Sequence, residues 1–404
     1  MNTWRLTGAR VALGAEEAKR FDIEVRAGRI AGLFQPGSRR TRMKTLNLGG
    51  CLVLPGLINA HDHLEFGLFP RLGRGPYPDA LAWANAIYQP NCSPVKEQLQ
   101  VPLRKRLLWG GVRNLLSGVT TVCHHNPYYR CFSQSFPVRV ARGFGWAHSL
   151  QFSPDLRARH RRTRGDRPFV LHLGEATGRQ GAREIHQLDA WGALDDRTVL
   201  VHGVAFGARE LRLVSSRGAR LVWCPSSNLF ILGRTLDARA FAGRIPIALG
   251  TDSPLSAAGD LLDELRLARK IMKLPPPRLY GMVTSEAARV MKLGDGAGAL
   301  EAGEGADILA VKDFGVTPAA ALLRLRTATM HLVMVGGEVK LASAELEASL
   351  PARVRRKLCP VVVESARTKQ RVFLAVPAAE LFKQTGQPPV HVLLAGKRIH
   401  RAAH

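Results

Sequence analysis

The chain has 404 residues, of which 46% are hydrophobic and 22% are charged. This composition excludes collagen-like, coiled-coil and disordered chains, and the length leaves room for roughly two or three domains. Lys and Arg outnumber Asp and Glu by 58 to 32, which gives a net charge of +26. No nucleic-acid-binding motif accompanies this charge, so we interpret it as a solvated basic surface and expect no nucleic-acid partner.

The N-terminal segment lacks the apolar core and the cleavage site of a signal peptide, and no apolar stretch is long enough to cross a membrane. The 6 Cys are scattered and form no paired spacing. Scattered cysteines are typical of a reduced chain. We therefore expect a cytoplasmic protein that spans no membrane.

In chain order, residues 3–54 predict a small layer of short strands, with a turn at Gly28. From Pro55 onward, apolar runs alternate with helical stretches, and this alternation predicts repeated β-α units around a parallel sheet or barrel. The candidate inner strands are Leu57–His61, Val119–His125, Val138–Trp146, Phe169–His172, Val199–His202, Arg220–Trp223 and Ile245–Gly250. The candidate helices are Leu99–Leu116, Ala182–Trp191 and Asp260–Met272.

Strand patterns return from about Gly298, so that β-layers flank the α/β centre on both sides. We assign residues 1–54 and 298–350 to one composite β domain and residues 55–297 to the α/β domain. Residues 351–404 form a C-terminal extension, whose last segment, VHVLLAGKRIHRAAH, predicts one more strand that adds to the β domain.

Metal-ligating residue types recur where the predicted inner strands end. His61 and His63 stand two apart on one strand, so their side chains point to the same side. His172, His202 and Asp252 each follow a later strand. Strand ends that converge on one barrel axis bring these side chains together. Imidazoles with one carboxylate form the ligand set that holds Zn²⁺ or Fe²⁺ and leaves a position open for water.

Six segments in this order resemble the amidohydrolase superfamily, nearest its triazine-hydrolase and guanine-deaminase-like branch of cyclic amidine hydrolases. They are PGLINAHDH, HLGE, LVH, WCPSSNLFILGR, GTDS and GALEAGEGADILAV. The resemblance covers about residues 5–345. It implies an α/β fold, a distorted (β/α)₈ TIM barrel, with a β-sandwich formed from both chain ends.

The resemblance also implies the roles of residues. His61, His63, His172 and Asp252 match the metal ligands, and Asp252 also accepts a proton. Glu175 in HLGE matches the acid that shuttles protons, and His202 matches the histidine that orients water or substrate. Two-metal members use a bridging Lys or Glu, but no Lys stands between Lys105 and Lys270 and no Glu between Cys131 and Pro168. We therefore expect one divalent ion, zinc first and iron as the alternative.

The implied reaction is the hydrolysis of a carbon–nitrogen bond other than a peptide bond, above all the deamination of a purine-, pterin- or triazine-like ring. A metal ion makes hydroxide available at neutral pH, and Glu175 can protonate the leaving amine. Hydrolysis of an N-acyl or cyclic amide, or of a chlorinated ring, stays open because it uses the same groups. An inactive barrel that serves as a basic binding protein is a further alternative. The presence of all four metal-ligand residues together with Glu175 argues against such a loss of activity.

Four residues are candidates for contacts with a small-molecule substrate: Glu65, His125, Asn228 and Arg234. A salt bridge for Glu65, a core position for His125, and a turn at PSSN that accounts for the last two are equally open. Only 47 residues separate His125 from His172. We therefore expect the fourth barrel unit to be abbreviated. The family resemblance also suggests a homodimer.

Overall fold

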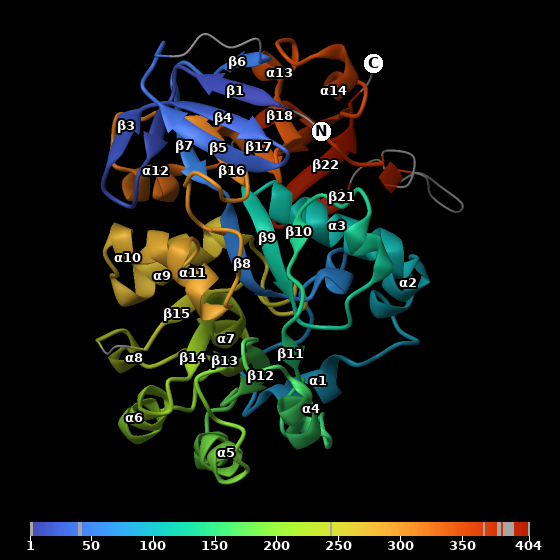
Figure 1. Ribbon diagram of the computed structural model, residues 1–404. Coiled ribbons are helices and arrows are strands. Elements are labelled where there is room, and N and C mark those ends of the chain that lie inside the picture. Colours follow the sequence, from blue (N-terminus) through green and yellow to red (C-terminus); the bar gives the residue numbers. More distant parts are fainter. Residues whose placement is uncertain are drawn as a thin grey trace.

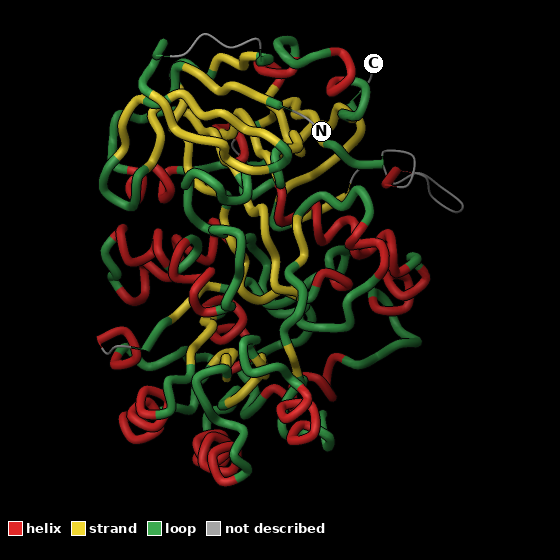
Figure 2. Tube along the Cα trace, viewed as in Figure 1, coloured by secondary structure: helices red, strands yellow, loops and turns green. Residues whose placement is uncertain are grey.

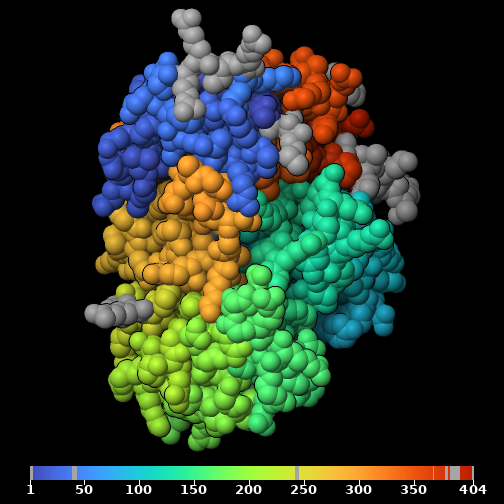
Figure 3. Space-filling view, in the orientation of Figure 1, coloured from blue at the N-terminus to red at the C-terminus, as the bar shows by residue number. Residues whose placement is uncertain are grey.

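A computed structural model describes residues 3–38, 43–242, 245–366, 368–377, 381–382 and 392–402. Strands from both ends of the chain gather at one end of the molecule, and strands surrounded by helices form the other end (Figures 1 and 2). In the space-filling view, the first and last segments of the chain lie next to each other (Figure 3). The middle of the chain therefore forms one unit, and its two ends combine into another.

In the described part of the chain, eight strands of the middle unit follow one another in space as in sequence. They are β8 (Leu57–Asp62), β9 (Val119–His124), β10 (Arg139–Val140), β11 (Gly145–Trp146), β12 (Phe169–Leu173), β13 (Thr198–His202), β14 (Arg220–Trp223) and β15 (Ile247–Leu249). They form two sheets, β10-β9-β8 and β11-β12-β13-β14-β15, in which each pairing is parallel. A parallel bridge between Asp62 and Asp252 brings the last strand back to the first. This arrangement is TIM-barrel-like.

The single strand predicted over Val138–Trp146 is wrong, because this segment forms two short strands. β10 pairs with β9 and β11 pairs with β12. Gly143 lies between them with a φ of 80°, a conformation that favours glycine and turns the chain. The barrel is therefore abbreviated between its third and fourth strands, where residues 141–144 replace a crossover helix. The abbreviation thus lies in the third unit, one unit earlier than expected, because α4 follows β11, the fourth strand.

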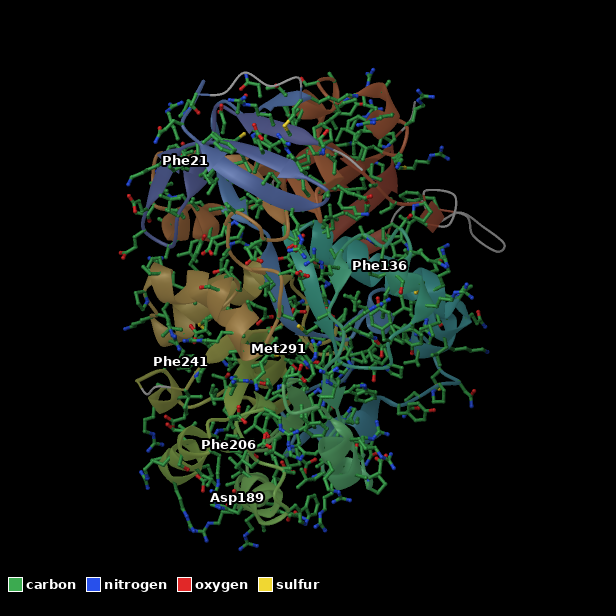
Figure 4. All side chains as sticks on the ribbon, in the orientation of Figure 1. Phe21, Phe136, Asp189, Phe206, Phe241 and Met291 are labelled. Atoms are coloured by element: carbon green, nitrogen blue, oxygen red, sulfur yellow. The ribbon has the colours of Figure 1, made fainter. Side chains whose placement is uncertain are left out.

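The helices of the middle unit lie outside these strands, and the short helix η1 comes directly after the end of β8. They are η1 (Leu64–Phe66), α1 (Ala80–Ile87), α2 (Val95–Gln100), α3 (Leu103–Leu115), η2 (Arg130–Ser133), α4 (Leu156–Arg162), α5 (Arg179–Ala190), α6 (Ala208–Ser216), α7 (Pro225–Leu232), α8 (Arg239–Ala242), α9 (Leu261–Met272), α10 (Pro276–Gly281) and α11 (Ser285–Val290). Phe241 of α8, labelled in Figure 4, packs edge-on against Trp223 of β14, with ring centroids 4.9 Å apart. None of the helices in the described residues combines the length and apolar character needed to cross a bilayer.

The helix predicted over Leu99–Leu116 is interrupted. α2 ends at Gln100 and α3 begins at Leu103, with Pro102 as its N-cap residue. A proline disfavours the helical conformation of the residue before it, and Val101 is extended. The helix predicted from Asp260 agrees with α9, whose first backbone N–H groups donate to the Asp260 carboxylate.

Two sheets make up the other unit. The smaller contains β5 (Arg29–Phe34), β4 (Asp22–Arg26), β1 (Trp4–Thr7) and β6 (Thr45–Asn47). Over the described residues the larger runs in the order β21 (Val392–Leu394), β22 (Lys397–Arg401), β19 (Cys359–Glu364), β20 (Lys369–Leu374), β18 (Glu338–Ser343), β17 (Met330–Val335), β16 (Ile308–Lys312), β7 (Cys51–Pro55), β2 (Arg10–Ala12) and β3 (Ala18–Arg20). Four short helices accompany them: α12 (Pro318–Arg324), η3 (Thr327–Thr329), α13 (Ala344–Glu347) and α14 (Ala352–Arg355).

One buried cluster joins the two sheets, with Trp4 and Ile23 from the smaller and Val53 and Ile308 from the larger. The C-terminal extension contributes β19 to β22 to the larger sheet, where one strand had been expected. The rest of the expected final strand, residues 390–391 and 403–404, lies outside the described residues. The two ends of the chain thus share both a sheet and a core.

Leu309 of β16 belongs to the core cluster that also contains Leu57 and Val119, the first residues of β8 and β9. Its side chain is fully buried. We predict that Leu309→Ala lowers the free energy of unfolding by about 2–5 kcal/mol, because the lost methyl groups leave a cavity between the two units. Denaturant titration measures this loss. Leu13→Ala, at a leucine that is 43% exposed, is the control, and an equal loss there would contradict the explanation.

Candidate metal centre

His61 is on β8 and His63 follows its end, so the alternation along the strand directs both rings to one side of the backbone. Their ring centroids are 5.0 Å apart. Asp62 points the other way, where its carboxylate accepts hydrogen bonds from Asn59 at 3.1 Å and Asn114 at 2.7 Å. The strand therefore presents two imidazoles to the centre of the barrel and anchors itself through the residue between them.

His172 at the end of β12 and Asp252 after β15 meet these two rings. The Nε2 atoms of His172 and His61 lie 3.1 Å apart. Asp252 Oδ1 lies 3.6 Å from His61 Nε2 and 3.5 Å from His63 Nε2. One ligand atom from each of the four residues lies within 4.8 Å of the others, and all four residues are buried.

Hydrogen bonds behind the cluster fix the direction of its ligand atoms. His172 Nδ1–H donates to the His148 carbonyl at 2.8 Å, which leaves Nε2 with its lone pair facing inward. Ser227 and Ser256 donate to Asp252 Oδ2 at 2.6 and 3.0 Å, which leaves Oδ1 for the centre. Facing lone pairs at this distance repel each other unless a cation lies between them, so the donor set fits a divalent ion.

The charge states agree with this fit. Burial lowers the pKa of His63 and of His172 well below the usual value, and neighbouring imidazoles lower each further. Burial alone would raise the pKa of Asp252, but His61, His202 and His63 together hold it well below its usual range. Neutral imidazoles and an ionised carboxylate are the forms that bind metal.

Glu175 and His202 form a second group, which shares Asp252 with the first. His202 Nε2 lies 3.5 Å from Glu175 Oε2. Burial raises the pKa of Glu175 to about 7, although nearby His202 opposes this. Gly174, with a φ of 66°, turns the chain between His172 and Glu175; a side chain there would collide with the ring of Phe206 (Figure 4). Glycine in HLGE therefore helps to place the carboxyl group.

A cavity of about 510 Å³ opens beside both groups. It reaches His63, His172, Glu175, His202 and Asp252, and the rest of its lining consists of Phe66, Phe69, Leu72, Ala80, Trp83, Ala84, Asn85, Ile87, Tyr88, Val95, Leu99, Asn126, His148, Phe152, Ser253 and Leu255. A concave site with converging polar groups at one end is the usual form of a small-molecule site.

None of the four predicted substrate contacts is among these lining residues. Glu65 is buried and accepts a hydrogen bond from Asn126, and burial raises its pKa to about 7. His125 donates through Nε2–H to the Ala147 carbonyl at 3.0 Å, and its ring packs at a tilt against that of His172, 4.4 Å away between ring centroids. Both residues lie behind the cavity wall.

Asn228 and Arg234 are also placed away from the cavity. Asn228 is fully buried in α7, so PSSN begins a helix and is not an isolated turn. Its Oδ1 accepts a hydrogen bond from His202 Nδ1–H at 2.7 Å, and its amide donates to Thr235. Arg234 is exposed. Asn228 therefore holds the ring of His202, and substrate binding by Asn228 and Arg234 stays a prediction.

The sequence analysis missed His148, which lines the cavity and contacts His172, with ring centroids 4.7 Å apart. Its Nδ1 is buried without a hydrogen-bond partner among the described residues. The rule that polar residues follow inner strands would have found it, since His148 follows β11 closely. His148 stands two residues after Trp146, the residue that ends both the predicted strand and β11.

Comparisons with known proteins agree with this geometry. Residues 165–340 match the amidohydrolase family. A 5-methylthioadenosine/S-adenosylhomocysteine deaminase from Natronomonas pharaonis is 26% identical over 88% of this chain and 96% of its own length. An 8-oxoguanine deaminase from Pseudomonas aeruginosa is 30% identical over 51% of this chain and 50% of its own. The crystal structure of an atrazine chlorohydrolase from Arthrobacter aurescens TC1, complexed with zinc, has a TM-score of 0.68 at 19% identity, with 83% of this chain and 94% of that chain covered.

These findings confirm the predicted resemblance to the amidohydrolase superfamily. The chain is a metal-dependent hydrolase of carbon–nitrogen bonds other than peptide bonds. Its fold is TIM-barrel-like α/β with an additional domain. Its substrate is a small molecule.

We predict that His172→Ala strongly reduces the metal content of the purified protein, because it removes one of four converging ligand atoms. Elemental analysis after dialysis measures this change. His160→Ala is a matched control, since His160 is 3% exposed, close to the 4% of His172, and lies outside the cluster. Equal metal content in the two variants would contradict the assignment.

Proposed function

We propose that this protein deaminates an amino-substituted heterocyclic ring of the purine, pterin or triazine kind, with one divalent ion, zinc first and iron second. The observation that carries the proposal is the position of Glu175. Its carboxyl group, with a pKa of about 7, shares a cavity and Asp252 with four converging metal-ligand side chains. Names of two relatives, both deaminases, support this choice of reaction.

His61, His63, His172 and Asp252 would hold the ion. When bound, a divalent ion makes hydroxide available near neutral pH by lowering the pKa of water. The four ligands come from three strand ends that are fixed by the barrel, so the chain supplies a preformed site. The finer description of the fold, a distorted (β/α)₈ barrel with a β-sandwich, is part of this proposal, as are the homodimer and a cytoplasmic location.

The chain's own groups can carry the protons. Asp252 is ionised and can accept a proton from the attacking water. Burial raises the pKa of Glu175 to about 7, so this carboxyl group can hold a proton near neutral pH and can protonate a ring nitrogen and later the departing amine. Two carboxyl groups in one cavity thus serve opposite roles because their surroundings move their pKa values apart.

His202 orients the reacting groups. Its Nδ1–H is held by Asn228, so its Nε2 carries the lone pair and faces Glu175. His202 has a φ of 78° and Asp252 a φ of 54°, backbone conformations that are strained for residues with side chains. Such strain is common at catalytic sites, where the surrounding structure stabilises it.

A screen for ammonia release tests the proposal. Aminopurines, aminopterins and aminotriazines are compared with N-acyl compounds, cyclic amides and a chlorinated triazine, using protein whose metal content is known. Ammonia from an amino-substituted ring supports the proposal. Carboxylate or chloride as the only product, with no ammonia from any ring, would replace it with one of the alternative hydrolases.

We predict that Glu175→Gln keeps the metal content but lowers kcat by roughly 10²–10⁴-fold, because glutamine cannot transfer a proton. The matched control is Glu184→Gln. Glu184 is a nearby carboxylate whose pKa burial also raises, but it accepts hydrogen bonds from Gly174 and Gln151 and does not line the cavity. Equal rates for the two variants would remove Glu175 from the mechanism.

We also predict that Asn228→Leu lowers kcat by roughly 10- to 100-fold with little change in KM, because His202 loses the group that holds its ring. Steady-state kinetics measure the two constants separately. Thr235→Val is the control: it removes the partner of the Asn228 amide and leaves the bond to His202. A rise in KM alone would indicate that Asn228 contacts substrate.

A further inference from the structure

Most of the cavity wall outside the metal-ligand cluster is apolar. Phe69, Val95 and Leu255 form a small buried cluster there, against which Phe66, Leu72, Trp83 and Ile87 pack. Most of these residues belong to the segment between β8 and α3, which includes α1 and α2. This segment therefore forms an apolar part of the cavity beside the reacting groups, which we call the chamber.

Large apolar side chains at this wall are open to solvent. Tyr88 is 74% exposed, Leu99 is 45% exposed and Phe152 is 47% exposed, and all three line the cavity. Among the described residues, only six large hydrophobic side chains are exposed to this extent, so half of them gather at one cavity. When an apolar ligand group replaces the water on such a surface, the free energy of binding becomes more favourable.

Away from the proposed metal ion, the described lining of the cavity carries no cationic Lys or Arg side chain, although the chain has a net charge of +26. Arg106 lies over the ring of Phe69, 5.7 Å from its centroid, but its guanidinium donates to the backbone carbonyls of Val101 and Glu65. An anionic substituent in this chamber would lose its hydration without gaining a cationic partner.

The cavity is also larger than an unsubstituted ring would fill. Cavities of about 300–1,000 Å³ bury ligands of drug-like size, and this one has a volume of about 510 Å³. The reacting groups form only a small part of its lining, so an unsubstituted ring bound beside them leaves much of the apolar lining uncovered. A substituent on the ring would fill that space.

We propose that the substrate is an amino-substituted ring that carries an uncharged, apolar substituent, and that this substituent occupies the chamber lined by Phe69, Trp83, Leu99, Phe152 and Leu255. The inference rests on the proposed ring deamination and specifies its substrate class. Rings with a phosphate or carboxylate substituent are poor substrates, because the chamber offers no counter-charge. Rings with a sugar substituent fall between the two, because their hydroxyl groups lose water at an apolar wall.

A series of 9-substituted 6-aminopurines tests this inference, with hydrogen, methyl, butyl, benzyl, ribosyl and 3-carboxypropyl as the substituents. Both kcat/KM for ammonia release and the dissociation constant from titration calorimetry are measured. Each buried methylene group is expected to raise kcat/KM about fourfold. The butyl compound should exceed the carboxypropyl compound at least tenfold in both quantities. Equal values for these two compounds, or a preference for the carboxylate or the ribosyl compound, would overturn the inference.

Variants locate the effect in the chamber. Leu99→Ser and Phe152→Ser should each reduce the ratio of butyl to unsubstituted kcat/KM at least threefold. Leu13→Ser is the matched control, since Leu13 is 43% exposed and lies outside the cavity lining; its ratio should not change. An unchanged ratio in both chamber variants would contradict the inference.

The two proposals fail in different ways. If no ring releases ammonia, the proposed function is wrong, and the calorimetric series still decides whether the chamber prefers apolar substituents. If rings release ammonia but neither kcat/KM nor affinity follows the apolar size of the substituent, the deaminase stands and the chamber has another role.

Discussion

The structure depends on parallel strands that end at the same edge and deliver three imidazoles and a carboxylate to one point. These groups lie within 4.8 Å of one another and are buried, an arrangement that neighbouring lone pairs oppose. Hydrogen bonds from the next layer of residues keep it in place, among them the His148 carbonyl behind His172 and the two serines behind Asp252. The strands and these hydrogen bonds therefore fix the direction of the ligand atoms, and a divalent ion would attract all four of them.

The metal centre and its cavity differ in charge from the basic exterior of the protein. Exposed arginines pair with nearby acids, as Arg217 does with Asp189 (Figure 4) and Arg159 with Asp155. The described lining of the cavity contains carboxylates, imidazoles and apolar side chains, with neither Lys nor Arg. The described lining of the cavity therefore differs in charge from the strongly basic chain around it.

Much of the site could be predicted because local rules govern it. The alternation of side chains along a strand places His61 and His63 together, and apolar runs that end in His or Asp mark the strand ends. Prediction failed where the local signal was ambiguous. VRVARGFGWA has the composition of one strand, yet Gly143 divides it into two. Asn228 stands at the right strand end, but its helix turns it toward His202, which sequence spacing alone does not show.

The sequence by itself determined the order of strands and predicted candidate ligand residues and a kind of reaction, because residue type and short-range spacing fix which groups each strand end carries. Only the tertiary structure decided which of these groups meet, which stand behind them, and how the cavity is lined. Residues from α1, α2 and the segment after β11 form one wall although they are far apart in the chain. Their contact arises from packing between elements, and the free energy of such packing depends on shape and burial, which no local pattern encodes.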